Sequence, residues 1–403
     1  MNPQDGEIYA LAIYPSFDLN DPFTIQDEEL SAKWETLSAK EQMDSLNGMW
    51  RNFCINDTYE PGSTFKIITA SAALSEGKVS LTDTFHCGGS MVVADRRIRC
   101  HKTSGHGTLT FPQGVQQSCN PVFMTLAARL GAETFYQYLH LFEFDQKTGI
   151  DIPGEAKGIL HPLADVGPVE LATMGFGQSL TITPMQLLRA AAAVVNGGTL
   201  VTPHFGKEIQ NEAGECLKEF SFAREEGVLS REVSDTMRKI LESVVTEGGG
   251  SRAAVPGYTV GGKTATSQKL PRSAHKYISS FLGFSPTEDP KIIVLCVVDE
   301  PEGIYYGSTV CAPIVQEFLS NVLPYLGIEP QYTEEETGGV IPAPSVTGCS
   351  YAEARRIARE AGLELRSLGT GVSVTEQYPA AGENINAGTQ LIVYLGGGEE
   401  ETP

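Results

Sequence analysis

The chain has 403 residues, of which 41% are hydrophobic and 20% are charged, and its formal net charge at pH 7 is −21. This length and composition predict a globular protein with one large core and room for a small second domain. The negative charge argues against nucleic acid or an anionic membrane surface as a partner, because both would repel the chain. No run of about eighteen apolar residues occurs, so no part of this sequence is expected to span a membrane.

The predicted elements begin with a turn over residues 1–6 and an alternating pattern over residues 7–14, which predicts a strand. No basic and apolar leader precedes them, and the abrupt start suggests that the sequence was cut from a longer protein. Turn residues before Ser63 and apolar helical spacing after it predict a helix over residues 63–74. A cap residue followed by proline predicts a buried, alanine-rich helix over residues 184–196.

Further along the chain, we expect a hairpin over residues 206–222 and an amphipathic helix over residues 231–245. Three strand patterns follow in close succession, over residues 258–267, 277–284 and 291–298. Consecutive strands this close predict an antiparallel sheet flanked by helices, so the fold class is α+β.

The C-terminal part is predicted to be separate from a first domain of residues 1–328. Residues 329–339 are polar and acidic without apolar periodicity, which predicts a linker. Residues 340–396 have a helical pattern over 351–361 and then two alternating strand patterns, which predict a small α+β domain. The last residues, 397–403, are predicted to be disordered.

Three motifs carry candidate chemistry, and the first is Ser63-Thr64-Phe65-Lys66. Three residues apart on a helix, the serine and the lysine project from one face, so a neutral Lys66 would take the proton of Ser63. The positive end of the helix dipole favours both an alkoxide and a lowered lysine pKa. This spacing alone occurs in many unrelated helices, so it needs support from elsewhere in the chain.

The second motif is Ser118-Cys119-Asn120. It supplies a hydroxyl that can pass a proton and an amide that can orient a substrate carbonyl or the lysine. By itself, such a triplet is equally typical of an ordinary turn or helix cap.

The third motif is Lys263-Thr264-Ala265-Thr266, on a predicted strand. Lys263 and Ala265 face one way, and Thr264 and Thr266 face the other. The edge of such a strand can bind an extended peptide, whose carboxylate would meet the lysine and the hydroxyls while a backbone N–H stabilises an oxyanion. The alternative is an ordinary solvated strand.

Together and in this order, the motifs resemble the active-site set of penicillin-binding proteins and serine β-lactamases. The resemblance is close to the class B penicillin-binding proteins, which are monofunctional peptidoglycan D,D-transpeptidases and targets of β-lactams. It extends through residues 57–62, Gly175-Phe176-Gly177-Gln178 and Val298-Asp299-Glu300-Pro301. Residues 340–396 resemble a PASTA domain, and a single such domain is typical of the sporulation-specific branch. The resemblance therefore implies work in spore-cortex or septal wall synthesis.

This resemblance also implies a penicillin-binding transpeptidase or serine β-lactamase-like fold and a serine acyl-enzyme. Ser63 would be the nucleophile, Lys66 the general base, Ser118 the proton relay and Asn120 the positioning amide. The implied binding residues for the substrate carboxylate are Lys263, Thr264 and Thr266. The oxyanion hole would be formed by the backbone N–H groups of Ser63 and Thr266.

The implied partners are peptidoglycan stem peptides, covalently bound β-lactams and a membrane glycosyltransferase. The implied location is the extracytoplasmic face of the cell membrane, with an anchor in an N-terminal segment outside this sequence. The chemistry requires no cofactor. Two alternatives stay open, a serine β-lactamase or β-lactam sensor and a catalytically silent scaffold that binds wall peptides.

Two residues depart from the family pattern on the third motif. The family usually has glycine where this chain has Ala265, and alanine where it has Ser267. Either a small side chain is tolerated at Ala265, or its methyl group crowds the site and weakens some β-lactams.

Cys87 and Cys100 flank a short predicted hairpin that leads toward Ser118. Thiolate and imidazole ligands suit tetrahedral zinc, so the segment holds a candidate structural zinc site. The candidate ligands are Cys87, Cys100 and His106, with Asp57 or His101 as the fourth. A disulfide or two unrelated thiols are the alternatives. Cys119 is expected to be packed in the core without a role.

Overall fold

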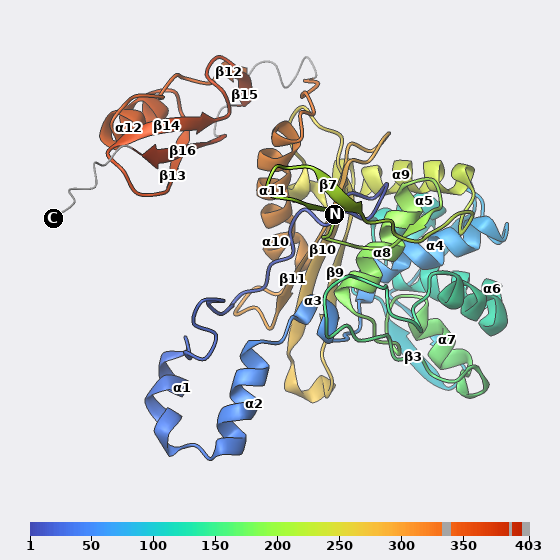
Figure 1. Ribbon diagram of the computed structural model, residues 1–403. Helices are drawn as coiled ribbons and strands as arrows, with labels where there is room; N and C mark the ends of the chain where they lie inside the picture. Colours follow the sequence, from blue (N-terminus) through green and yellow to red (C-terminus); the bar gives the residue numbers. More distant parts are fainter. Residues whose placement is uncertain (333–339, 387–388, 397–403) are drawn as a thin grey trace. The chain divides into compact units, whose positions relative to one another are not determined.

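The structure is a computed structural model that describes residues 1–332, 340–386 and 389–396 (Figure 1). The chain forms two compact units, the first of residues 1–253 and 260–315, the second of residues 254–259 and 316–403. The division therefore falls upstream of the predicted boundary at residue 328. Most of the predicted linker, and the whole of the predicted tail, lie outside the described residues.

The sheet of unit 1 has the order β11-β10-β9, and both pairings are antiparallel. The strands are β9 (Gly261–Gln268), β10 (Tyr277–Ser285) and β11 (Ile292–Asp299). They confirm the prediction of three consecutive antiparallel strands. β9 is an edge of this sheet, so one row of its backbone N–H and C=O groups is not paired within the sheet.

Four helices build the core beside this sheet, where α4 contacts α6, α8 and α9, and α9 contacts β9 (Figure 1). Their bounds are α4 (Lys66–Ser75), α6 (Asn120–Leu141), α8 (Pro184–Val195) and α9 (Arg231–Thr246). Nearly every residue of α4 is buried, because its small and apolar side chains allow close packing on several sides. The three helices predicted here are confirmed, except that the first begins as a 3-10 turn, η2 (Gly62–Phe65).

An insert between α4 and α6 consists of short antiparallel pairs, β1 with β4 and β2 with β3. Its elements are β1 (Thr84–Cys87), β2 (Ser90–Val93), β3 (Arg96–Arg99), β4 (Gly107–Thr110) and α5 (Phe111–Gln116). Thr110 caps α5 in a capping box with Gln113, and α5 leads directly into the second motif. The predicted hairpin between Cys87 and Cys100 is thus β2–β3.

The N-terminal segment differs from its prediction. Residues 7–14 form no strand, because only Glu7 finds a bridge partner, in His204, and Tyr14 is 98% exposed. A helical arm follows that carries both tryptophans of the chain. Its elements, with the short helix that ends it, are α1 (Glu28–Lys33), η1 (Trp34–Thr36), α2 (Ala39–Met49) and α3 (Phe53–Asn56).

The remaining elements of unit 1 are short. Its helices are η3 (Leu163–Asp165), α7 (Pro168–Met174), η4 (Ser251–Ala253), η5 (Arg272–Ala274) and α10 (Gly307–Val310). The longer helix α11 (Ala312–Tyr325) lies mostly in unit 2, which resumes at residue 316. The strands are β5 (Leu200–Val201), β6 (Glu208–Gln210), β7 (Cys216–Glu219) and β8 (Arg224–Glu225). β6 pairs with β7 and β5 with β8, so the predicted hairpin over residues 206–222 is confirmed.

The C-terminal domain packs one helix on a small mixed sheet of order β13-β16-β14. Its elements are β12 (Val340–Pro342), α12 (Tyr351–Glu360), β13 (Glu364–Leu368), β14 (Ser373–Tyr378), β15 (Asn384–Asn386) and β16 (Gln390–Gly396). Its core includes Ala354 and Ala358 of the helix with Leu391 and Val393 of β16. The predicted helix and strands are confirmed.

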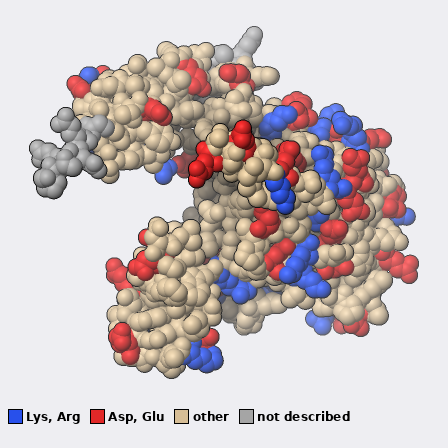
Figure 2. Space-filling model, in the orientation of Figure 1, with Lys and Arg blue, Asp and Glu red and all other residues tan. Residues whose placement is uncertain are grey.

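Acidic and basic side chains lie interspersed over much of the face in Figure 2, as expected for a soluble surface with an acidic excess. Within the described ranges, no helix combines the length and the hydropathy needed to cross a bilayer.

Candidate active site

Ser63 lies in the tight turn η2, which positions it at the start of a buried helix. Gly62 before it has a positive φ of 58°, and its N–H donates to Gly177 O at 2.9 Å. A Cβ at Gly177 would collide with the backbone of Gly62, so the two glycines allow the chains to touch. Gly175-Phe176-Gly177-Gln178, noted in the sequence only as a resemblance, thus supports the nucleophile turn.

Lys66 is fully buried and is held by the second motif. Its Nζ lies 2.7 Å from Ser118 O, 2.7 Å from Asn120 Oδ1 and 3.1 Å from Ser118 Oγ. The two carbonyl-type oxygens only accept, so Lys66 donates to both of them. A neutral amine would use its two hydrogens there and keep its lone pair for the proton of a hydroxyl. Ser63 makes no side-chain hydrogen bond within the described part of the chain, and it is partly exposed.

Burial lowers the pKa of Lys66 to about 7, although the nearby Cys100 and Cys119 act in the opposite direction. The physical cause is the loss of water around the ammonium, which disfavours the charged form. A lysine that is half neutral near pH 7 is suited to act as a general base.

Lys263, on the edge strand, is also fully buried. Burial first, and the positive charge of Lys66 second, lower the pKa of Lys263 well below its ordinary value. The pKa of Lys263 therefore depends on the charge of Lys66, and β9 contacts η2, so the first and third motifs lie close together. The Nζ of Lys263 donates only to Thr264 O, at 3.1 Å, among the residues that the structure describes.

The two faces of β9 have different surroundings. On the face of Lys263, a Cβ at Gly62 would meet Ser267 Oγ and would lie 3.8 Å from the Ala265 methyl, so this face lies against the nucleophile turn. Ser267 Oγ is buried there and has no hydrogen-bond partner among the described residues. On the other face, Thr266 Oγ1 accepts a hydrogen bond of 3.1 Å from Gly307 N. Thr264 shares that face and is partly exposed.

A carboxylate that was not singled out in the sequence joins the two sides of the site. Glu60 accepts from Ser179 N at 2.9 Å and from Arg272 Nη2 at 2.7 Å. Arg272 lies in the loop between β9 and β10, so the ion pair ties the segment before Ser63 to the end of the edge strand. Glu60 is 12% exposed at its side chain, which makes this pair less screened than a surface pair.

The cysteine prediction needs one correction. The ligand atoms of four buried or half-buried residues, Cys87, Cys100, His106 and Cys119, all lie within 4.8 Å of one another. Asp57, the tentative fourth ligand, is not among them, because its carboxylate accepts from Arg51 Nε at 2.7 Å. His101 Nδ1 approaches Cys100 Sγ at 3.8 Å but lies outside the group of four.

Cys119 is therefore the cluster residue that the sequence interpretation missed. The signal for it was its place inside the second motif, directly after an insert that contains two other cysteines. All eight cysteines are free thiols in this structure. The hydrogen bond with the Cys119 thiol lowers the pKa of Cys100.

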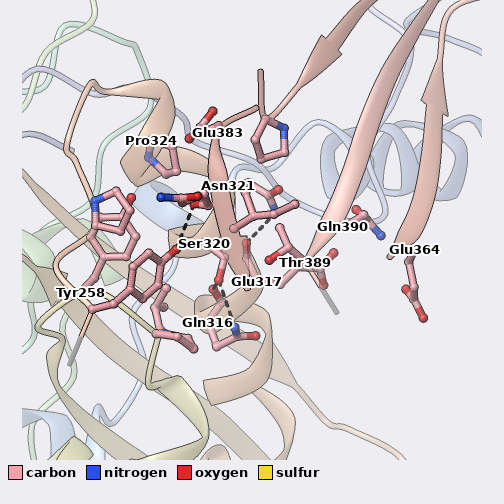
Figure 3. Close-up of a pocket in the computed structure, with 17 residues that line it drawn as sticks. Tyr258, Gln316, Glu317, Ser320, Asn321, Pro324, Glu364, Glu383, Thr389 and Gln390 are labelled. Atoms are coloured by element: carbon pink, nitrogen blue, oxygen red, sulfur yellow. Dashed lines mark hydrogen bonds between the residues drawn. The ribbon is translucent and has the colours of Figure 1, made fainter. Parts of the chain in front are cut away.

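Unit 2 contains a pocket of about 320 Å³, shown in Figure 3. Its lining mixes polar and apolar side chains and includes Gln316 and Ser320 of α11, which are joined by a hydrogen bond of 3.0 Å. None of the three motifs contributes a residue to this lining, so the pocket is not the candidate active site.

A family model described as the penicillin binding protein transpeptidase domain matches residues 1–320, and a PASTA domain model matches residues 341–397. The three motifs meet at one site, and this site together with the family match defines the class of the protein. The chain belongs to the penicillin-binding protein transpeptidase family and carries a PASTA domain. The predicted family and fold class are confirmed.

Two individual relatives show which members of this family the chain is similar to. Stage V sporulation protein D of Bacillus subtilis (strain 168) is 41% identical over 407 residues, which cover 98% of this chain and 60% of that protein. The probable peptidoglycan D,D-transpeptidase PenA of Neisseria meningitidis serogroup B is 31% identical over 86% of this chain and 54% of PenA. The chain thus spans little more than half the length of these relatives.

Solved structures show the same fold. A putative peptidoglycan glycosyltransferase from Atopobium parvulum aligns with a TM-score of 0.68 and 29% identity over 82% of this chain and 72% of that one. The D,D-transpeptidase domain of a peptidoglycan glycosyltransferase from Eggerthella lenta aligns with a TM-score of 0.69 and 25% identity over 81% of this chain and 77% of that one.

Proposed function

We propose that the chain is the catalytic part of a peptidoglycan D,D-transpeptidase that works in spore-cortex synthesis. The observation that carries the proposal is the group of hydrogen bonds that holds a buried, partly neutral Lys66 against Ser118 and Asn120, one helical turn from Ser63. The names of the B. subtilis and Neisseria relatives support the sporulation setting and the reaction class.

In the proposed first step, the Ser63 hydroxyl attacks the carbonyl carbon between the two D-alanines of a donor stem, and its proton passes to Lys66. The tetrahedral intermediate collapses when the C–N bond breaks. The leaving amine of D-alanine receives a proton through Ser118, which already lies 3.1 Å from Lys66 Nζ. An ester between Ser63 and the shortened stem remains.

In the second step, an amine of an acceptor stem attacks the ester carbonyl. The new amide bond forms, the Ser63 oxygen leaves, and the proton of the amine returns to that oxygen through Lys66. The terminal carboxylate of the donor would lie against Lys263, Thr264 and Thr266. Backbone N–H groups of Ser63 and Thr266 would bind the oxyanion, each worth about 3 kcal/mol in other acyl-transfer enzymes.

Covalent labelling with a fluorescent penicillin tests the proposal. We expect stoichiometric labelling of the chain and loss of at least about 10⁴-fold in the labelling rate for Ser63→Ala, because the ester with penicillin would form on the Ser63 oxygen and alanine has no such oxygen. Full labelling of Ser63→Ala would contradict the assignment. Rapid turnover of a chromogenic cephalosporin would instead indicate a β-lactamase.

The partner and the location follow from the family alone. We propose that the full-length protein is anchored at the extracytoplasmic face of the membrane and works beside a membrane glycosyltransferase that supplies glycan strands. Co-purification of the full-length protein with such an enzyme from sporulating cells tests the partnership. Its repeated absence under mild detergent extraction would count against it.

We further propose that Cys87, Cys100, His106 and Cys119 bind a structural zinc ion. Three thiolates and one imidazole form a common tetrahedral zinc set, and the four ligand atoms lie close enough to share one ion. Because Cys119 separates Ser118 from Asn120, the ion would fix the backbone that carries both partners of Lys66. It would take no part in the acyl transfer.

Metal analysis of chain purified without chelators tests the zinc site, with about one zinc per chain expected and less than about 0.2 contradicting it. Cys119→Ser should lower the metal content and reduce the melting temperature by on the order of 5–10 °C, because a tightly bound ligand stabilises the folded state. Cys216→Ser is the matched control, since Cys216 is exposed on β7 and should change neither quantity.

A further inference from the structure

The β2–β3 hairpin is locally basic, although the chain as a whole is acidic. Between Thr84 and Asn120 the sequence has a single acidic residue, Asp95, and four basic ones. The basic residues are Arg96, Arg97, Arg99 and Lys102, and all four are exposed. In a chain with net charge −21, the sign of the charge is reversed in this segment, which leads into the second motif.

The hairpin has one face packed on the protein and one face free. Met91 and Ile98 are paired across the two strands and pack against the hydrophobic core. Since side chains alternate along a strand, Arg97 and Arg99 lie on the opposite face together with the 59% exposed Val92. The core contact therefore holds the two arginines toward solvent.

Most of these cations have no acidic partner within the described part of the chain. Arg96 is within 3.9 Å of Asp95, but among the described residues no carboxylate lies within ion-pair distance of Arg97, Arg99 or Lys102. Among the residues that the structure describes, the side chain of Arg97 donates only to Ser90 Oγ, at 3.2 Å. Exposed guanidinium groups without a carboxylate partner are well suited to bind carboxylates that come from outside the chain.

The hairpin is directly bonded to the catalytic machinery. Asn120 Nδ2 donates to Arg99 O at 3.2 Å, while Asn120 Oδ1 accepts from Lys66. The end of β3 is therefore one side chain away from the proposed general base. The backbone of the strand that carries both arginines thus lies beside the site where the acyl-enzyme would form.

From this juxtaposition, and resting on the transpeptidase function proposed above, we propose that Arg97 and Arg99 bind the carboxylates of the acceptor stem peptide. The donor stem has its own anchor for a terminal carboxylate in the third motif. The acceptor must bring an amine to the Ser63 ester, and stem peptides carry further free carboxylates beside that amine. The arginine face supplies the opposite charge on the side of Asn120.

The test separates donor chemistry from acceptor binding. The full chain is acylated with a thioester analogue of the donor, and transfer is measured to a synthetic acceptor stem peptide with free carboxylates and to the same peptide with those carboxylates amidated. For Arg97→Gln/Arg99→Gln we expect penicillin labelling within about twofold of wild type and a rise of about fivefold or more in the KM for the free-acid acceptor. The wild-type KM should rise with added salt, and that of the variant should not.

Controls make the result specific to charge at this site. Arg97→Lys/Arg99→Lys should recover most of the acceptor affinity, and Arg224→Gln/Arg231→Gln removes two exposed arginines elsewhere without effect. Metal content should stay at the wild-type value. An unchanged KM, an equal loss with the amidated acceptor, or a loss of penicillin labelling that the lysine variant does not restore would each overturn the proposal. If the wild-type chain is not labelled by penicillin at all, the proposed function itself has failed.

Discussion

The two sides of the active site each bury a lysine, and the two lysines are satisfied differently. Lys66 has three oxygen partners from its own chain, at 2.7 to 3.1 Å. Lys263 has one, a backbone carbonyl on its own strand. For both, burial is the main cause of a lowered pKa, and neither has an acidic partner among the described residues.

This difference distinguishes the surroundings of Lys66, whose hydrogen-bond acceptors are already in place, from those of Lys263, which would gain a charged partner from a ligand. The surroundings of Lys66 favour a neutral amine that already has its acceptors, as a general base requires. Lys263 pays the desolvation cost of a buried ammonium without the opposite charge that would offset it. A substrate carboxylate would supply that charge, so binding at the edge strand should be coupled to protonation of Lys263.

The largest effect should come from Lys66→Met, which removes the base and keeps the volume. We expect acylation by penicillin to fall about 10³- to 10⁴-fold, the contribution of a positioned general base. Stopped-flow labelling measures the rate, and circular dichroism checks the fold. If the rate fell less than about tenfold, the contrast between the two lysines would be wrong.

Lys263→Met should have a smaller and more selective effect. Loss of a hydrogen bond to a charged partner should lower kcat/KM for β-lactams with a carboxylate by about 10- to 100-fold. A neutral ester of the same β-lactam should lose much less, because it lacks the charge that Lys263 binds. Equal losses for acid and ester would show that Lys263 acts only through the fold.

The pH dependence should report Lys66. Since only the neutral amine accepts a proton, and burial places the pKa of Lys66 at about 7, acylation should rise as the pH rises through 7 and level off above it. At pH 6 the rate should be about one tenth of the plateau. A profile that is flat from pH 5.5 to about 8.5 would argue for another base.

Ala265→Gly should have the smallest effect. The methyl group of Ala265 is 4% exposed and lies on the face of β9 that packs against the nucleophile turn. We expect cephalosporin acylation to change less than about threefold, because one methyl group adds little volume. A much larger gain would show that this side chain crowds the site.

Local signals predicted the central sheet, three of the helices in unit 1 and the small C-terminal domain, but not the long helix α6 or the helical arm. The start of α8 follows from the cap residue Thr183 and the proline after it, and α9 follows from its amphipathic pattern. The three close strand patterns left few alternatives to an antiparallel sheet. The strand predicted from the alternation over residues 7–14 does not form. A strand also needs a neighbouring strand to pair with, and a local pattern does not show whether one is present.

Long-range contacts explain what was missed in the site. Cys119 joins Cys87 and Cys100 only because α5 returns the chain to the hairpin, and Arg272 reaches Glu60 across 212 positions of sequence. Neither residue spacing nor secondary-structure propensity predicts such long-range contacts. The motif residues were predictable because their chemistry restricts which residue types can serve.

The placement of the tryptophans has a consequence for optical experiments. Both indoles of the chain belong to residues 34–50, where the ring of Trp50 packs edge-on against Phe23 with centroids 5.4 Å apart and its Nε1 donates to Pro22 O at 2.7 Å. Intrinsic fluorescence excited at the long-wavelength edge of the tryptophan absorption band will therefore report the unfolding of the helical arm alone. Acylation of Ser63 or unfolding of the sheet will not change the tryptophan fluorescence unless a new tryptophan is introduced near them.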